Sequence, residues 1–240
     1  MPLQRLDGRA ATAIRPLRFQ RRWLDAVAGS VLTDLGGTRV LCTVLIQDGV
    51  PPFLQGSDQG WVTAEYAMLP ASTGDRHQRD RNGRTDGRAV EIQRLIGRAL
   101  RAVVNRKAFP GRTVWVDCDV VAADGGTRTA AINGAYVALH DAFKELQGRN
   151  GLRFWPLADS VRAISVGVLG NDILADLSYY EDSQADVDMN LVMTGSGRLI
   201  EVAGGAERGS FSLQQMHSMI DIGTDALARV GEAQEAALSQ

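Results

Sequence analysis

The sequence predicts an α+β protein, in which sheets of mainly antiparallel strands are covered by helices. Three observations indicate this class. Runs of alternating β-branched residues meet at glycine-containing turns, and longer segments carry apolar residues at helical spacing. The two kinds of segment follow one another without the regular spacing of a parallel βαβ series. Each half of the 240-residue chain contains a hairpin and later a helix, although the letters show no convincing repeat.

The first half is predicted to contain a hairpin and then a further strand. Two β-rich runs within residues 30–46 are joined at Gly36 and Gly37, because glycine accepts the positive φ that a tight turn needs. Residues 55–69 are interpreted as a loop followed by a strand.

A polar segment and a helix follow that strand. Residues 72–88 contain glycines and almost no apolar residue, which predicts a long mobile loop of the kind that is usually functional or disordered. Within residues 90–105, apolar side chains recur on one stripe while arginines lie off it, which predicts an amphipathic helix. The stripe consists of Ile92, Leu95, Ile96, Ala99, Leu100 and Val103.

The second half repeats this plan. A strand over residues 113–121 leads through a glycine-rich corner into a helix over 128–147, which Gly148 can end. Residues 161–180 predict a hairpin that turns near Gly170, and residues 189–204 predict another.

The last predicted element is an amphipathic helix from about residue 213 to residue 237. Ser212 and Gln215 match a capping box, in which two side chains satisfy backbone N–H groups of the first turn. The buried stripe is expected to consist of Leu213, Met216, Ile220, Leu227 and Val230.

Composition excludes several classes of protein. Apolar residues make up 45% of the chain and charged residues 22%, which is typical of a globular protein rather than a disordered one. No apolar run is long enough for a membrane span, and the first residues lack the apolar core of a signal peptide, so we expect a cytoplasmic protein. GxxxxGK[ST], GxGxxG and GxSxG motifs and zinc-type cysteine or histidine pairs are absent from the sequence.

The net charge of −2 conceals an uneven distribution of charge. Residues 76–107 contain ten basic residues, nine of them arginine, and three acidic ones, whereas residues 179–188 are acidic. A locally cationic surface can bind phosphates even when the whole molecule is nearly neutral. The alternative is that the arginines form an ordinary solvated helix face.

The corner between the 113–121 strand and the next helix suits an anion. Its residues, ADGGTRTAAINGA (122–134), place two glycines and Arg128 where the helix begins. The first turn of a helix has backbone N–H groups without partners, and the guanidinium group of arginine matches phosphate oxygens. The alternative is an ordinary glycine turn with Thr127 or Thr129 as the helix cap.

A pair of carboxylates is the candidate counterpart of this corner. Asp182 and Asp188 flank the start of the predicted hairpin strand. They can converge on Mg²⁺, which prefers oxygen ligands and keeps waters that bridge to phosphates, or one of them can move a proton. The alternative is an acidic turn that keeps an exposed sheet edge soluble.

Longer stretches of the chain match a known family. They include QGWVTAEYAMLP (59–70), GRAVEIQRLIGRALRAVV (87–104), DCDVVAADGGTRTAAINGAYVAL (117–139) and YEDSQADVDMNLVMTGSG (180–197). With them, nearly the whole chain resembles the bacterial ribonuclease PH family of phosphate-dependent exoribonucleases. The resemblance implies a ribosomal protein S5 domain 2-like fold of duplicated hairpin and helix units, with residues 1–240 as a single phosphorolytic exoribonuclease domain.

The resemblance also implies roles for residues whose motifs are intact. It implies that inorganic phosphate is held by Arg88, Gly126, Thr127 and Arg128. It identifies Asp182 and Asp188 as the catalytic acidic pair, which would hold Mg²⁺. It further implies that the arginine-rich loop contacts RNA through Arg76, Arg79, Arg81 and Arg84.

The implied activity is 3′-to-5′ trimming of tRNA precursors and other RNA 3′ ends. Terminal nucleotides would be transferred to inorganic phosphate, releasing nucleoside diphosphates in a reversible reaction, and copies of the chain would form a homohexamer built as a trimer of dimers. Two alternatives stay open: a non-catalytic RNA-binding ring subunit of an exosome-like assembly, and a metal-dependent hydrolytic nuclease.

The chain departs from the family's pattern at residues 71 and 89 and within residues 203–208. Ala71 replaces an arginine, Ala89 a threonine, Ala203 a glutamine and Gly205 a threonine. These departures leave the phosphate arginines and the aspartate pair intact, so we expect effects on rate or substrate preference.

Overall fold

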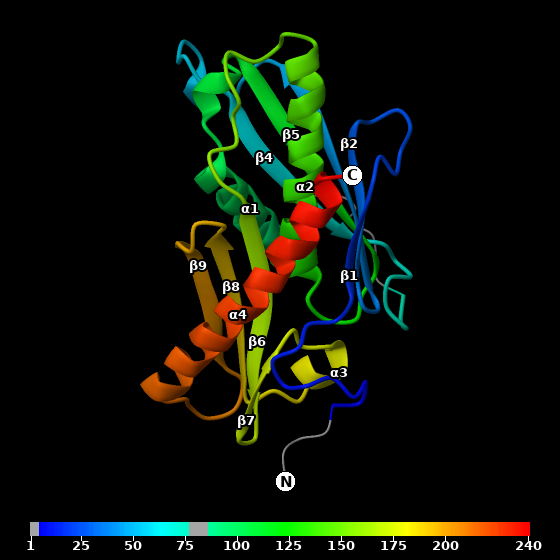
Figure 1. Ribbon diagram of the computed structural model, residues 1–240, viewed down its shortest axis with the longest axis vertical. Helices are drawn as coiled ribbons and strands as arrows, with labels where there is room; N and C mark the ends of the chain where they lie inside the picture. Colours follow the sequence, from blue (N-terminus) through cyan, green and yellow to red (C-terminus); the bar gives the residue numbers. More distant parts are fainter. Residues whose placement is uncertain (1–4, 77–85) are drawn as a thin grey trace.

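The computed structural model describes residues 5–76 and 86–240. These residues form two β-sheets and four α-helices, which confirms the α+β class. The first sheet lies toward one end of the long axis and the second toward the other (Figure 1). None of the helices within the described ranges is long and apolar enough to cross a membrane.

The first sheet has five strands in the order β1-β2-β3-β5-β4. Neighbouring strands are antiparallel except β4 and β5, which are parallel. The predicted turn at Gly36 and Gly37 joins β2 to β3, and Gly36 has the expected positive φ of 57°. The strand bounds are β1 Leu17–Arg21, β2 Gly29–Leu35, β3 Thr38–Asp48, β4 Trp61–Met68 and β5 Arg112–Ala122.

Helices α1 (Gly87–Val103) and α2 (Thr127–Gly148) pack on this sheet. Helix α1 lies against β4, and every member of its predicted apolar stripe is buried. Helix α2 lies against β2 and β3 and also contacts the second sheet, so most of its side chains are buried. Two short 3₁₀ helices, η1 (Pro52–Leu54) and η2 (Arg106–Ala108), lie in the connections around β4 and β5.

The second sheet is antiparallel throughout, with the order β7-β6-β8-β9. Both predicted hairpins are present, one turning at Gly170 and the other between β8 and β9. The first hairpin ends earlier than expected, because residues after Ala175 leave the sheet. The strand bounds are β6 Val161–Leu169, β7 Asp172–Ala175, β8 Val187–Thr194 and β9 Leu199–Ala206.

A short helix, α3 (Tyr179–Asp182), lies between β7 and β8 and was not predicted. Ser178 caps it by accepting from the N–H of Glu181, and the Glu181 carboxylate accepts from the N–H of Ser178 at 2.8 Å. The sequence contains the Ser-x-x-Glu pattern of a capping box at these positions, and this pattern could have predicted the start of α3.

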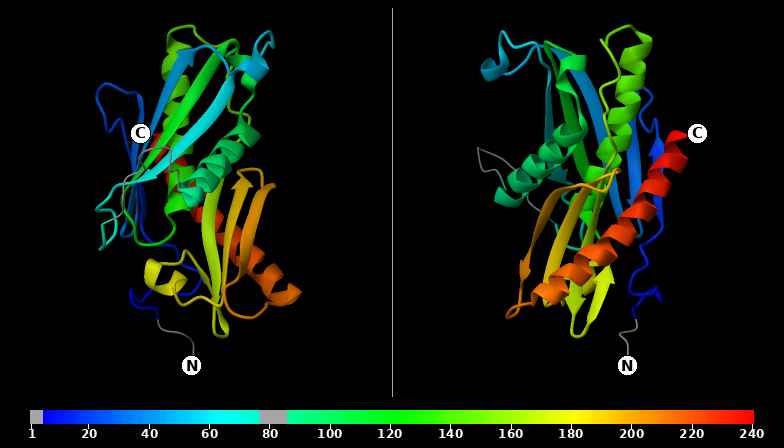
Figure 2. Two further views of the ribbon diagram at one scale, coloured as in Figure 1. Left: turned by 180° about the vertical axis from the view of Figure 1, so that it is seen from behind. Right: turned by 60° about the vertical axis from the view of Figure 1, so that its left-hand side comes forward.

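Helix α4 (Leu213–Leu238) begins at the predicted Ser212–Gln215 capping box. It packs across the second sheet and reaches β1 and α2 (Figures 1 and 2). The predicted stripe is wrong at Leu213, which is 74% exposed, while Met216 and Ile220 are half-buried and Leu227 and Val230 are buried as predicted. The buried face instead passes through Gly223, where an added Cβ would lie 2.2 Å from Cδ1 of Leu191. This close approach determines which face of the helix meets the sheet.

Candidate functional site

The glycine corner before α2 has the geometry of an open helix start. Gly125 and Gly126 have φ values of 71° and 65°, and Gly126 is the N-cap without a side-chain cap. The alternative of a threonine cap is therefore not observed. Thr129 Oγ1 donates back to the Gly126 carbonyl oxygen at 2.9 Å, and Thr127 Oγ1 accepts from the Tyr66 hydroxyl at 2.8 Å. The corner is therefore shaped to present backbone N–H groups to an anion.

Tyr66 is a site residue that the sequence analysis did not single out. It lies on β4 with 5% of its surface exposed. Burial raises the pKa of its hydroxyl, although the hydrogen bond to Thr127 and the charges of Arg88 and Arg128 lower it, so Tyr66 stays neutral. Because Thr127 Oγ1 accepts from Tyr66, its own hydrogen remains to be donated to a ligand.

Arg88 and Arg128 occupy the first turns of α1 and α2. The Arg88 N–H donates to the side chain of the N-cap Asp86, and Arg128 Nη1 lies 3.4 Å from Glu91 Oε1. Burial raises the pKa values of Asp182 and Asp188, and the charges of both guanidinium groups oppose that rise. Two cations that are distant in sequence therefore act on the same pair of carboxylates.

Asp182 ends α3, and Asp188 lies on β8. Burial raises the pKa of Asp182. Burial and the charge of Asp182 together raise the pKa of Asp188 to about 6, with a further contribution from Glu207. Asp188 Oδ1 is buried and has no hydrogen-bond partner among the described residues. Glu207, directly after β9, is a second contributor that the sequence analysis did not assign.

The donor set fits a hard cation such as Mg²⁺. Two carboxylates and a buried, unpartnered Asp188 oxygen offer the ligand type that Mg²⁺ prefers. In the part of the chain that the structure describes, no group of three or more His, Cys, Asp or Glu side chains is placed to hold a metal ion.

One departure from the family's pattern lies directly beside the carboxylates. Gly205 on β9 pairs with Asp188 on β8. An added Cβ at Gly205 would meet no heavy atom within 4 Å, so the fold leaves room there for the family's threonine. Glycine therefore opens space next to Asp188.

Of the four predicted RNA-contacting arginines, the structure describes Arg76 alone. Arg76 is exposed near the end of the first described range. Arg79, Arg81 and Arg84 lie outside the described residues, as does residue range 77–85 of the predicted mobile loop. Their role stays a prediction.

Two family models match the chain. The 3′ exoribonuclease family, domain 1, matches residues 13–145, and the 3′ exoribonuclease family, domain 2, matches residues 159–226. The chain therefore belongs to the 3′ exoribonuclease, or RNase PH, family. The phosphate-side residues fall in the first match and both aspartates in the second, so the candidate site lies between the two halves. The bacterial branch and the single domain over residues 1–240 stay predictions.

Solved structures of similar fold include subunits of exosomes. The crystal structure of rice (Oryza sativa) Rrp46 is 24% identical with a TM-score of 0.78, covering 98% of this chain and 100% of that chain. The Archaeoglobus fulgidus exosome with RNA bound to the active site is 20% identical with a TM-score of 0.81, covering 95% and 92%. An archaeal exosome core is 20% identical with a TM-score of 0.79, covering 97% and 91%. At these identities the likeness shows the fold.

Proposed function

We propose that this protein is a phosphorolytic 3′-to-5′ exoribonuclease that trims tRNA precursors. One observation carries the proposal: the charges of Arg88 and Arg128, at the starts of two helices, act on the same two half-buried carboxylates, Asp182 and Asp188. Phosphoryl transfer between two anions needs positive charge that positions the nucleophile and neutralises the reacting group. This site supplies that charge beside acidic groups that can hold a cation or a proton.

The corner is proposed to bind the attacking inorganic phosphate. Arg88 and Arg128 can each donate two N–H groups to its oxygens, while the start of α2 at Gly126 and the Thr127 hydroxyl supply further donors. Tyr66 holds the Thr127 hydroxyl in place through the 2.8 Å hydrogen bond. These groups reduce the repulsion between the free phosphate and the RNA backbone.

The carboxylate pair is proposed to act on the phosphodiester. Asp182 and Asp188 would hold Mg²⁺, which when bound supplies positive charge to the scissile phosphoryl group. A phosphate oxygen forms the new bond to phosphorus as the bond to the penultimate nucleotide's 3′ oxygen breaks. A carboxyl of the pair that is not a ligand of the cation can instead deliver the proton that this 3′ oxygen needs. The products are a nucleoside diphosphate and a shortened RNA.

The reaction is proposed to be reversible. It exchanges one phosphoryl bond for another of similar energy, so high concentrations of nucleoside diphosphate should extend an RNA 3′ end. The further parts of the proposal are processing of tRNA and rRNA in the cytoplasm, RNA contacts by Arg76, Arg79, Arg81 and Arg84, and a homohexamer built as a trimer of dimers. The likeness to exosome core chains supports a ring assembly with RNA.

A second candidate function is a non-catalytic RNA-binding ring subunit of an exosome-like assembly. The likeness to chains of exosomes favours it as much as it favours an enzyme. The presence of both phosphate arginines and both aspartates in one site supports the enzyme instead. Unchanged RNA turnover after Arg128→Ala would favour the non-catalytic alternative.

The proposal is tested with a 3′-extended tRNA and Mg²⁺, with and without inorganic phosphate. We expect shortening and nucleoside diphosphates only with phosphate, and loss of both in Arg128→Ala and Asp182→Asn. A matched control is Arg149→Ala, an exposed arginine at the far end of α2 that pairs with Glu145. Release of monophosphates with or without phosphate would contradict phosphorolysis and favour a hydrolytic nuclease.

A further inference from the structure

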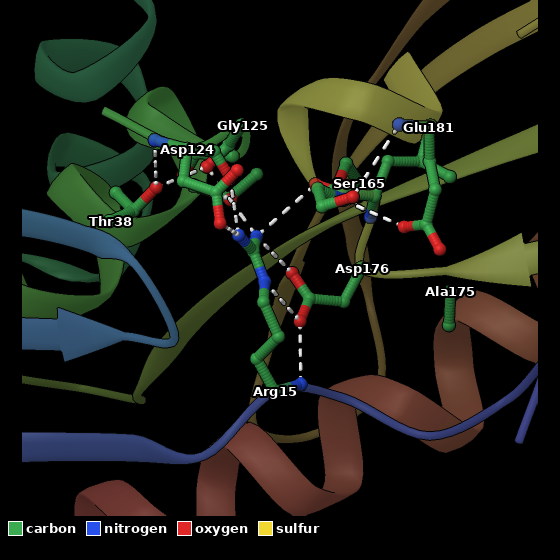
Figure 3. A network of polar contacts seen from close by, with 12 residues as sticks. Arg15, Thr38, Asp124, Gly125, Ser165, Ala175, Asp176 and Glu181 are labelled. Atoms are coloured by element: carbon green, nitrogen blue, oxygen red, sulfur yellow. Dashed lines mark hydrogen bonds and ion pairs between the residues drawn. The ribbon is translucent and has the colours of Figure 1, made fainter. Parts of the chain in front are cut away.

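A buried ionic network connects the glycine corner to the segment that leads to the aspartates (Figure 3). At its centre is Arg15, a buried residue just before β1. Its Nε and Nη2 donate to the Asp176 carboxylate at 2.9 and 2.7 Å, and its backbone N–H donates to the same carboxylate at 2.6 Å. Its Nη1 donates to the Asp124 carbonyl oxygen, and its Nη2 reaches the Leu177 carbonyl oxygen at 3.2 Å. One guanidinium group therefore connects two segments that are about 50 residues apart in sequence.

The two connected segments touch through their backbones. An added Cβ at Gly125 would lie 2.6 Å from the Leu177 carbonyl oxygen and 2.7 Å from the Tyr179 nitrogen. The Tyr179 N–H also donates to Asp124 Oδ1 at 3.2 Å. Gly126, Thr127 and Arg128 follow Gly125 directly, and Asp182 lies one helical turn beyond Tyr179. A change of spacing at this contact would therefore change the spacing within the site.

Each side of the contact is fixed by further hydrogen bonds. Thr38 Oγ1 donates to the Gly125 carbonyl oxygen at 2.6 Å and accepts from the Asp124 N–H at 2.9 Å. On the other side, Arg5 donates to both carboxylate oxygens of Glu181 at 2.7 Å. Asp176 holds a left-handed φ of 55°, which is uncommon for a non-glycine residue and needs support from its surroundings.

We propose that Arg15 is a positioning residue that sets the spacing between the phosphate-binding corner and the Asp182–Asp188 pair. Arg15 and the corner lie in the first family match, whereas Asp176 and both aspartates lie in the second. The planar guanidinium group donates in several directions at once, which the single ammonium group of lysine cannot reproduce. The inference rests on the proposed function, because it concerns the same site.

The test compares the wild type with Arg15→Lys, which keeps the charge and loses the planar donor group. The matched control is Arg21→Lys. Arg21 makes an equally well-formed pair with Asp141, at 2.8 and 2.6 Å, and has no hydrogen bond to the corner. Two readouts are taken without RNA: phosphate affinity by titration calorimetry, and amide hydrogen exchange over residues 123–128 and 176–183.

Arg15→Lys should weaken phosphate binding by about tenfold, the loss expected for one or two charge-assisted hydrogen bonds. It should also speed exchange in both segments, while Arg21→Lys changes neither quantity. Unchanged phosphate affinity would overturn the inference, whatever the hydrogen exchange shows. An unchanged affinity with faster exchange spread evenly along the chain would indicate that Arg15 has a merely structural role.

A second variant keeps the test decisive if Arg15→Lys does not fold. Asp124→Ala removes a side chain that is 44% exposed, and with it the contacts to Arg15 and Tyr179. Asp124→Ala should weaken phosphate binding and speed amide exchange in both segments, each by less than Arg15→Lys does. Wild-type phosphate affinity together with wild-type exchange would overturn the inference. Because neither readout uses RNA, release of monophosphates by the wild type would contradict the proposed function while leaving this result intact.

Discussion

Asp188 shows how a single side chain acquires chemistry from its surroundings. Burial and the neighbouring Asp182 raise its pKa to about 6, while Arg128 and Arg88 oppose the shift. One of its oxygens is buried without a partner among the described residues. Such an arrangement is costly for an isolated protein and useful for a site that receives a cation or a proton.

Asp188→Asn should therefore stabilise the ligand-free protein near neutral pH and abolish RNA turnover. The folded protein binds a proton at Asp188 more readily than the unfolded chain does, so stability falls as pH rises from about 4 to about 6. A shift of this size corresponds to roughly 2–3 kcal/mol in the free energy of unfolding above pH 7. Urea unfolding at several pH values measures it.

The pH dependence of the stability gain distinguishes removal of the ionised Asp188 carboxylate from a stabilisation by Asp188→Asn that has another cause. The gain from Asp188→Asn should shrink as pH falls and approach zero at about pH 3, where the wild-type carboxyl is largely protonated in both the folded and the unfolded state. Asp225→Asn, on the exposed face of α4, is the control and should show no comparable gain. An equal gain at all pH values would contradict the explanation.

At the scale of elements, the periodicity of apolar residues and the glycine turns correctly predicted helices and hairpins whose pattern is local in sequence. The α1 stripe from Ile92 to Val103 is buried, and the glycine-turned hairpins are present. The exposed Leu213 shows the limit of this reasoning, because the buried face of α4 depends on a close contact between Gly223 and Leu191 from another element. Periodicity alone could not reveal that contact.

The separate parts of the candidate site could be predicted from the sequence, but their arrangement in space could not. The glycine corner and the acidic segment were visible in the sequence, but their meeting depends on tertiary contacts such as that of Gly125 with Leu177 and Tyr179, which spacing does not encode. The resemblance to a family supplied that pairing. Tyr66 and Arg15 were missed because an ordinary strand tyrosine and an N-terminal arginine carry no local sign of where their polar atoms lie.

The packing of α4 gives a prediction at this scale. Gly223→Ala should lower the free energy of unfolding by about 1–3 kcal/mol, because the added methyl meets the fully buried Leu191. Alanine's higher helix propensity, about 1 kcal/mol, offsets only part of this cost. Asp225→Ala, on the exposed face of the same helix, should stay within about 0.5 kcal/mol of the wild type. A stabilised Gly223→Ala protein would contradict the described packing.

At the scale of the whole molecule, the site depends on two halves that meet. The first sheet and its helices carry the cationic groups, and the second sheet and α3 carry the carboxylates. The chain as a whole is nearly neutral, with a net charge of −2. Under the proposed function, RNA binding would therefore depend on the local concentration of arginine rather than on total charge.

Binding of a 3′-extended tRNA should weaken steeply with salt, because cations on the protein replace counterions of the RNA. Measured by fluorescence anisotropy, Arg76→Ala should make the slope of log affinity against log salt about one unit shallower. Arg149→Ala, at the far end of α2, should leave it unchanged. A flat salt dependence of the wild type would contradict the predicted arginine contacts.

The central claim is that a free phosphate, held by Arg88 and Arg128, attacks the RNA beside Asp182 and Asp188. The most direct measurement supplies ³²P-labelled inorganic phosphate with Mg²⁺ and an unlabelled 3′-extended tRNA. We predict that the label appears in the terminal phosphate of the released nucleoside diphosphate. Label that stays in inorganic phosphate while the RNA is shortened would contradict the account.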